Sequence, residues 1–99
     1  MNTLRRTEEF IAWITKLKDV AGKARIAARL KLAAAGSFGD HKSVGQGVME
    51  MRINTGPGYR VYYAQEGETV YLLLIGGDKS TQEKDIKKAH ALWAEIKEG

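Results

Sequence analysis

The side chains best suited to chemistry in this sequence are three cations and a phenol. Arg52 lies in one segment in which apolar residues alternate with polar ones, and Arg60 and Tyr62 lie in the next such segment. Lys79 follows a third apolar run, within the stretch LLLIGGDKSTQEKDI that spans residues 72 to 86. Three cations and a phenol around one point would suit the binding of a phosphodiester. The question is whether the fold brings them together.

Strand periodicity predicts that it does. Side chains on a strand alternate between two faces, so the polar and apolar members of each segment separate. If the apolar members face the core, Arg52, Arg60 and Tyr62 share the opposite face, and Lys79 can join them. The other interpretation is a solvated charged face, in which Glu50 and Asp78 pair with these cations at little energetic gain.

The glycines before Lys79 do not form a nucleotide-binding P-loop. That motif requires glycine at positions 73 and 78, where this chain has Leu73 and Asp78. A simpler prediction is that Gly76 and Gly77 turn the chain and that Ser80 caps a helix. Lys79 remains unexplained, because a cation at a helix N-terminus is unfavourable unless an anion binds there.

Helical periodicity predicts three helices. Thr7 can cap a first helix and Asp19 a second, which Gly36 would end, so the two form a hairpin. A third helix would begin with a capping box, Ser80-Thr81-Gln82-Glu83, and continue through Ile86, Ala89, Trp93 and Ile96.

Between the helices the period becomes two, which predicts a meander of strands. Residues 36–47 are interpreted as a glycine-rich loop, and strands are expected over 49–54, 59–64 and 69–75. Residues 1–6 are expected to supply a short first strand. The order is (β)ααβββα, an α+β fold in which an N-terminal helical hairpin packs on a twisted antiparallel sheet and a C-terminal helix follows.

Composition favours a single domain over residues 1–99 with a polyanionic partner. The chain has 16 Lys and Arg against 12 Asp and Glu, a formal charge of +4 and a pI near 9.4. It has no cysteine, which excludes disulfides and cysteine-based sites. His41, expected in an exposed loop, and His90, expected on the last helix, are too few for a metal site. The longest apolar run, 70–75, is too short to cross a membrane, so a cytoplasmic location is expected.

Several runs of residues resemble a known protein family. GSFGDHKSVGQGVMEMRINTGPGYRVYY and LLLIGGDKSTQEKDIKKA, within residues 36–89, resemble the HigB-like, or addiction module killer, branch of the RelE/ParE toxins. The predicted helical hairpin before them also fits that family. The most specific parts are Gly56-Pro57-Gly58-Tyr59-Arg60 and the run from Gly77 to Gln82.

The resemblance implies the toxin of a type II toxin–antitoxin system. Many such toxins are ribonucleases that cut messenger RNA on the ribosome without metal or cofactor, and an antitoxin from the adjoining gene, often a helix-turn-helix protein, neutralises them. It implies that Arg60 stabilises the phosphate and that Arg52 and Lys79 add positive charge. Tyr62 would orient or donate a proton, or stack on a base. Lys42 and Gln82 are the expected RNA contacts.

Two other functions remain open at this stage. The ParE branch of the superfamily implies a poison of DNA gyrase that acts by binding. The third hypothesis is a toxin-like domain without activity that serves as an interaction module. The cationic set favours RNA cleavage, because a gyrase-binding protein needs no phosphate-stabilising cluster.

Overall fold

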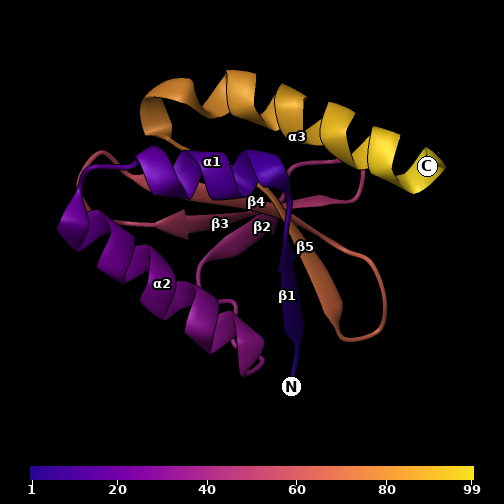
Figure 1. The fold of residues 1–99 in the computed structure, drawn as a ribbon, viewed down its shortest axis with the longest axis horizontal. Coiled ribbons are helices and arrows are strands. Elements are labelled where there is room, and N and C mark those ends of the chain that lie inside the picture. Colours follow the sequence, from indigo (N-terminus) through magenta and orange to yellow (C-terminus); the bar gives the residue numbers. More distant parts are fainter.

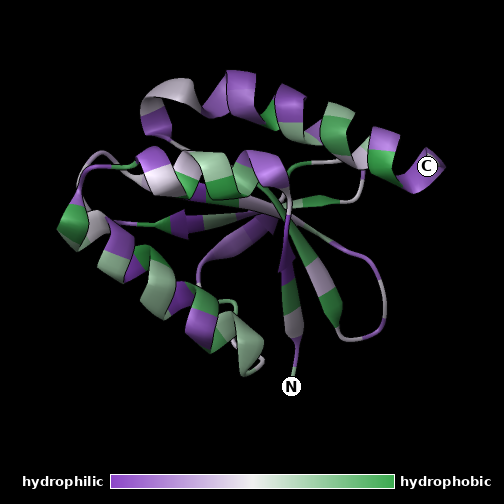
Figure 2. Cartoon of the chain, in the orientation of Figure 1, coloured by the Kyte–Doolittle hydropathy of each residue, from purple (hydrophilic) through white to green (hydrophobic).

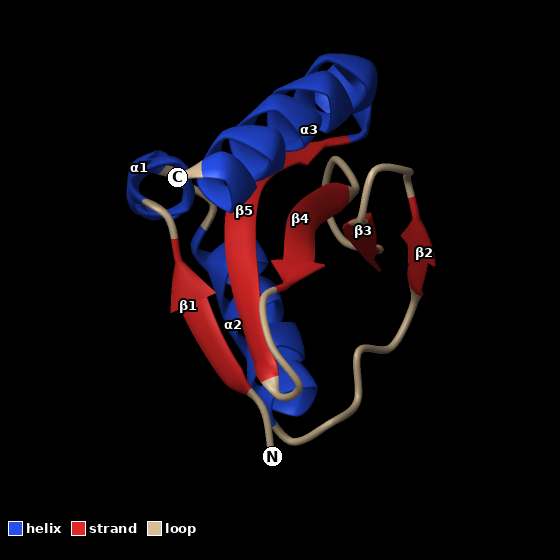
Figure 3. Ribbon diagram, turned by 90° about the vertical axis from the view of Figure 1, so that its right-hand side faces the viewer, coloured by secondary structure: helices blue, strands red, loops and turns tan.

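The computed structural model describes all residues from 1 to 99, which form a five-stranded sheet with helices on both faces (Figure 1). The strand order is β1-β5-β4-β3-β2, so β1 and β2 form the two edges (Figure 3). The elements in chain order are β1 (Thr3–Arg6), α1 (Glu8–Lys16), α2 (Val20–Ala34), β2 (His41–Ser43), β3 (Val48–Ile53), β4 (Tyr59–Gln65), β5 (Val70–Asp78), a 3₁₀ turn (Lys79–Thr81) and α3 (Gln82–Glu98).

The helical hairpin begins where its capping residues predicted. The Thr7 hydroxyl accepts a hydrogen bond from the Phe10 N–H at 3.0 Å, and an Asp19 carboxylate oxygen accepts one from Gly22 at 2.9 Å. These bonds satisfy backbone donors that the first helical turn leaves free. A second bond holds the elbow to the sheet, because the Tyr59 hydroxyl donates to Asp19 at 2.7 Å.

The sheet separates two hydrophobic cores. The α1–α2 side contains Phe10, Ile26, Leu30, Met51, Ile53, Tyr59, Val61, Tyr63 and Leu73, as strand alternation predicted for β3 and β4. The α3 side contains Val48, Tyr62, Ala64, Leu72, Leu74, Ile75, Ala89 and Trp93. The apolar run of β5 is therefore covered on both faces. A bulge opposite Tyr62 and Tyr63 leaves Leu74 without a partner and shifts the alternation of β5 by one residue.

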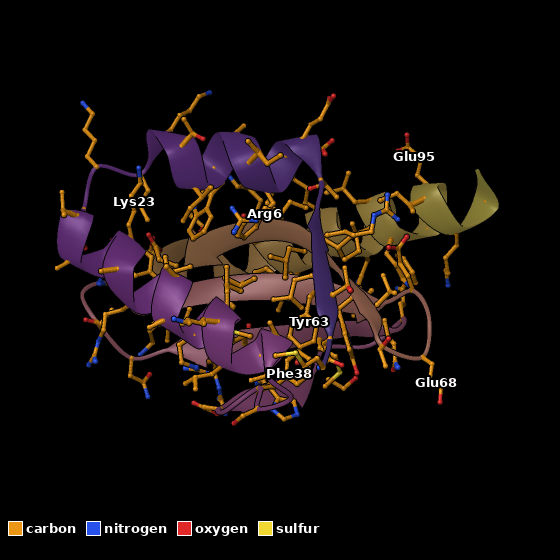
Figure 4. All side chains as sticks on the ribbon, turned by 60° about the horizontal axis from the view of Figure 1, so that its bottom comes forward. Arg6, Lys23, Phe38, Tyr63, Glu68 and Glu95 are labelled. Atoms are coloured by element: carbon orange, nitrogen blue, oxygen red, sulfur yellow. The ribbon has the colours of Figure 1, made fainter.

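The structure differs from the predicted order in two ways: it has one additional strand, β2, and one pair of strands is parallel. β2 lies within the segment predicted as a loop; its residues, His-Lys-Ser, are polar and exposed, so no apolar alternation marks them. The sheet is also not wholly antiparallel. β1 pairs with β5 in parallel, because α1 and α2 carry the chain across the sheet before the meander begins. Phe38, just before β2, stacks on Tyr63 with ring centroids 5.1 Å apart (Figure 4).

The predicted turn at Gly76 and Gly77 is wrong, because both glycines lie within β5. They are required for packing: a Cβ on Gly76 would overlap the Trp13 ring on one face, and a Cβ on Gly77 would overlap the Asp85 carboxylate on the other. Glycine here admits close contacts from both helical layers.

The predicted capping box at Ser80 is also wrong. Asp78 caps the 3₁₀ turn: its carboxylate accepts from the Ser80 N–H at 2.8 Å, and Thr81 Oγ1 accepts from the Asp78 N–H at 3.3 Å. The capping box therefore begins at Asp78, two residues before its predicted start at Ser80. The reason is that a 3₁₀ turn precedes α3.

Candidate functional site

The candidate site lies on the face of the sheet that α3 covers, where two rows of residues cross the strands. One row places Arg52 of β3 opposite Arg60 of β4, which in turn lies opposite Gly77 of β5. In the next row Glu50 lies between Lys42 and Tyr62. The period-two argument therefore placed these cations and the phenol on one face correctly. This part of the face is not solvated, because Glu50, Arg60 and Tyr62 are buried where the start of α3 packs over it.

Glu50 is the centre of this site. Its side chain is 0% exposed, and its Oε2 accepts hydrogen bonds from the Tyr62 hydroxyl at 3.0 Å and from Gln82 Nε2 at 2.8 Å. Arg60 Nε lies 3.8 Å from the same oxygen, close enough for an ion pair but too far for a hydrogen bond. Oε1 of Glu50 has no partner. A buried carboxylate of this kind is costly to keep and is held by all three neighbours together.

Arg60 and Lys79 both lie beside Gly58. Arg60 Nη1 donates to the Gly58 carbonyl at 2.8 Å. A Cβ built on Gly58, whose φ is +80°, would lie 3.1 Å from Arg60 Nη1 and 3.5 Å from the Cβ of Lys79. Arg60 is only 8% exposed, whereas Lys79 is exposed and forms no ion pair. The glycine turn between β3 and β4 thus places the buried Arg60 guanidinium near the base of the exposed Lys79 side chain.

Arg52 lies directly opposite Arg60 but is paired separately. Two like charges facing each other across strands repel. Arg52 Nη2 bonds to Asp40 at 2.8 Å, while Arg60 has Glu50, so each arginine has its own carboxylate. Arg29 of α2 fixes this arrangement, donating to the carbonyls of Arg52 at 2.6 Å and Phe38 at 2.9 Å. Arg52 therefore lies at the edge of the site rather than in its centre.

The environment of Tyr62 keeps its hydroxyl protonated. Burial raises the pKa of Tyr62 well above its ordinary value, and the adjacent Glu50 carboxylate raises it further. The protonated phenol cannot act as a base at neutral pH, and its raised pKa also makes it a weaker acid than an exposed tyrosine. The Tyr62 side chain is also 0% exposed, so a nucleotide reaches the hydroxyl only if Gln82 and the start of α3 move aside.

The remaining predicted residues divide between centre and edge. Gln82 belongs to the central network through Glu50, whereas Lys42 lies on the exposed edge strand β2. His41 is exposed as expected, on that strand rather than in a loop, and bonds through Nδ1 to the Gly39 carbonyl at 2.8 Å. His90 is half-buried on α3, as expected, and its Nε2 lies 2.9 Å from the Val44 carbonyl.

Asp85 also lies on this face, although its sequence pattern did not mark it as a functional residue. Its side chain is buried, packs over Gly77 and accepts a hydrogen bond from Thr81 Oγ1 at 2.5 Å. The signal available was the missing side chain at Gly77, which leaves room for such a group. Glu50 and Asp85 are thus two buried carboxylates on the face of the sheet that α3 covers.

Four hollows mark the surface, and none is lined by Arg60, Tyr62 or Lys79. Arg60 and Tyr62 are buried, so neither is reached through a hollow of the surface. No three potential metal ligands among the histidine, aspartate and glutamate side chains lie together. No helix has both the length and the apolar character needed to cross a membrane.

Comparison with known proteins identifies one clear relative. A protein of Haemophilus influenzae is 48% identical over 93 residues, which cover 94% of this chain and 94% of that protein. The two proteins belong to one family. The relative bears the name "Uncharacterized protein", so its name assigns no activity. No protein-family model matches the sequence.

Proposed function

We propose that this protein is the toxin of a type II toxin–antitoxin system, of the RelE/ParE-like fold, that cleaves messenger RNA on the ribosome without a metal. The observation that carries the proposal is that Arg60 and Lys79 both lie beside Gly58. The helical hairpin on a mostly antiparallel sheet supports it, because the sequence resemblance implies that architecture. The net charge of +4 is favourable for an RNA substrate.

The proposed reaction transfers a phosphoryl group within the RNA. The ribose 2′-hydroxyl gives its proton to solvent water, its oxygen bonds to the adjacent phosphorus, and the bond from phosphorus to the 5′-oxygen breaks. The products are a 2′,3′-cyclic phosphate and a 5′-hydroxyl that has gained a proton. Lys79, which is exposed, would contact the phosphoryl oxygens, and Arg60 behind it would offset the charge that develops there.

Tyr62 would supply the proton of the leaving 5′-oxygen. The phenol is protonated at neutral pH, as a donor requires, although the raised pKa of the buried hydroxyl makes it a weak acid while α3 covers it. Because Gln82 covers it, the proposal requires RNA binding to displace the first turn of α3. Lys42 on β2 would contact the RNA backbone away from the reacting phosphate.

The test is a cell-free translation reaction in which the 5′ ends of the message are mapped. We expect cuts in phase with codons that disappear when ribosomes are omitted. Lys79→Ala should lower cleavage by about 100-fold, the typical cost of losing one charge-stabilising group. Lys79 is exposed, so its loss should leave the fold intact. Lys18→Ala, which removes an exposed lysine at the elbow of the helical hairpin, is the matched control.

For Arg60 the better variant is Arg60→Lys. Alanine would leave the buried Glu50 without a cation and could unfold the protein, whereas lysine keeps the charge and loses the forked geometry. Full cleavage by both Lys79→Ala and Arg60→Lys would contradict the proposed site.

One observation favours the alternative of a ParE-like gyrase inhibitor. Arg60 and Tyr62 are covered by α3, and Arg60 has a carboxylate partner, so few catalytic groups are directly accessible. A protein that acts by binding alone would not need accessible catalytic groups. Intact messages together with a DNA-damage response would favour this function over RNA cleavage.

A further inference from the structure

A small hollow opens on the α1–α2 side of the sheet, near the edge strand β2. It has a volume of about 260 Å³, and its lining includes Phe38, His41, Met49, Tyr63 and Tyr71. No aspartate, glutamate, lysine or arginine lines it. Sites for drug-sized molecules are usually larger, about 300–1,000 Å³, so this aromatic hollow suits a single ring system.

Phe38 is the ring around which the aromatic hollow is built. It stacks on Tyr63 with 11° between the ring planes and centroids 5.1 Å apart, and Figure 4 shows the two close together. Tyr71 lies tilted against Phe38 at 4.8 Å and His41 at 6.0 Å, measured between ring centroids. Because these rings are already held by one another, a flat ligand that stacks on them would order few further side chains.

The chain around Phe38 fixes the position of that ring. Gly36 and Gly39 have φ angles of +106° and +65°, which favour glycine and turn the chain on either side of Phe38. Arg29 of α2 donates a hydrogen bond to the Phe38 carbonyl at 2.9 Å. These turns and this bond hold Phe38 half-buried at the hollow, where part of the ring remains open to a ligand.

Polar atoms without partners accompany these rings. The other two tyrosine hydroxyls of the chain are bonded to carboxylates, whereas those of Tyr63 and Tyr71 form no hydrogen bond with the protein. Tyr63 is only 2% exposed, yet both free hydroxyls keep contact with solvent. Burial, and then the neighbouring Tyr71, raise the pKa of Tyr63 to about 12. The Tyr63 hydroxyl therefore remains a hydrogen-bond donor at neutral pH.

His41 adds an acceptor at the rim of the hollow. Its Nδ1 lies 2.8 Å from the Gly39 carbonyl. Because a carbonyl oxygen only accepts, Nδ1 of the neutral ring carries the proton and Nε2 is left as an acceptor. The aromatic hollow thus offers one ligand a ring surface, hydroxyl donors and an imidazole acceptor.

We propose that the aromatic hollow binds one nucleobase. The base would stack against Phe38, its acceptor atoms would receive the tyrosine hydroxyls, and its exocyclic amino group would donate to Nε2 of His41. Proteins recognise unpaired bases through this combination of stacking and hydrogen bonds to base edges. An apolar side chain of another protein fits less well, because it would cover the two hydroxyls and leave them without partners.

The surroundings favour a base that belongs to an RNA strand. Figure 2 shows β2 as a hydrophilic strand, and Lys42, which follows His41, lies on its opposite face in the row of Glu50. An RNA strand that crosses this edge would place a base in the hollow and a phosphate at Lys42. The formal charge of +4 favours such a polyanion. Only this choice of an RNA strand over a free nucleotide rests on the proposed function.

The test uses the fluorescence of 2-aminopurine, a purine analogue whose emission falls when it stacks on another ring. One probe is its free nucleoside monophosphate. The other is a 2′-O-methyl hexanucleotide with 2-aminopurine at a central position, which cannot be cleaved because its 2′-oxygens are blocked. Both probes are titrated with the full-length protein. We expect quenching of both, with the hexanucleotide bound at least about tenfold more tightly because its phosphates contact the basic surface.

Variants locate the binding site. Phe38→Leu removes the stacking ring and should weaken binding of both probes at least about fivefold, the lower end of the effect of losing one stacking aromatic residue. Tyr63→Phe combined with Tyr71→Phe removes only the two hydroxyls and should weaken binding about fivefold. Tyr59→Phe, which removes a hydroxyl bonded to Asp19, is the matched control and should change binding less than about twofold. Thermal unfolding shows whether each variant retains the fold.

The proposal is overturned if the wild-type protein quenches neither probe at concentrations up to about 1 mM. It is also overturned if the folded variants of the hollow bind like the wild type, or if N-acetyl-phenylalaninamide displaces the probes equally well, which would mark a pocket for a protein side chain. If Phe38→Leu unfolds, the double tyrosine variant, which leaves every ring in place, decides the outcome.

Comparison of the two probes identifies the source of the base. Equal affinity for both, with the same dependence on Phe38, would retain the base site and assign it to a free nucleotide instead of an RNA strand. Neither probe is cleaved and no ribosome is present, so these outcomes are independent of whether the protein cleaves messages.

Discussion

Replacing Glu50 with alanine should destabilise this protein more than any change of a surface charge. The carboxylate is fully buried and serves three neighbours at once: the Tyr62 hydroxyl, the Gln82 amide and the Arg60 guanidinium. Alanine would leave the buried Tyr62 hydroxyl, the buried Arg60 guanidinium and the half-buried Gln82 amide without their acceptor. Removing one partner of a buried ion pair typically costs about 3–5 kcal/mol. The free energy of unfolding should therefore fall by about that amount.

Glu50→Gln is the matched variant. The amide oxygen can still accept from Tyr62, and the volume is preserved, so the cost should be about half that of alanine. For a domain of this size each kcal/mol lowers the melting temperature by roughly 4–8 °C, so alanine should lower it by at least about 12 °C. Tyr62→Phe combined with Glu50→Gln should cost less than the two single changes added, because the residues share one bond.

Urea unfolding monitored by circular dichroism measures these differences directly. The slope of the unfolding free energy against urea concentration must stay constant for the comparison to hold. A loss of less than about 1 kcal/mol for Glu50→Ala would refute the reasoning, because an exposed charge pair is worth no more than that. It would mean that Arg60 and Tyr62 do not depend on Glu50.

Three further changes test the packing and the caps. Gly77→Ala should cost about 1–3 kcal/mol in the free energy of unfolding, because its Cβ would overlap a buried carboxylate, whereas Gly67→Ala should be nearly neutral; equal effects would contradict the packing. The Asp19 carboxylate raises the pKa of Tyr59 to about 12, so the stability that this bond adds is complete below pH 10 and is lost between pH 10 and 12. Tyr59→Phe should therefore be less stable at pH 7 and lose less stability over that window, as followed by alkaline unfolding; an unchanged profile would refute it. Arg29→Lys should cost about 1–3 kcal/mol in urea unfolding, because lysine lacks the fork that reaches two carbonyls, and a change near zero would show that the clamp is dispensable.

Local sequence patterns were sufficient to predict the helices and to assign the side chains of the central strands to the two faces of the sheet. Thr7 and Asp19 cap helices because their side chains satisfy nearby N–H groups, which depends only on residues within one turn. The alternation in β3 and β4 sorted Val61 from Tyr62 because a strand has a period of two wherever it lies. That same rule placed Arg52 and Arg60 on one face.

The errors arose where distant segments decide the structure. β2 has no apolar alternation and becomes a strand only because β3 offers it hydrogen bonds. Gly76 and Gly77 have the composition of a turn, but they remain in β5 because Trp13 and Asp85 occupy the space above and below them. No local pattern contains information about atoms that arrive from another part of the chain.

The sequence by itself determined which side chains share a face of the sheet, since the period of a strand is a property of the backbone. Only the tertiary structure decided which of those side chains are buried and which stay exposed to solvent. Once α3 packs over the sheet, Glu50 loses water and must be satisfied by Tyr62, Gln82 and Arg60, because a carboxylate removed from solvent has no other source of stabilisation. Lys79, just before the helix, stays in water. Burial is a property of the assembled layers, and it separates two cations that appear equivalent in the sequence.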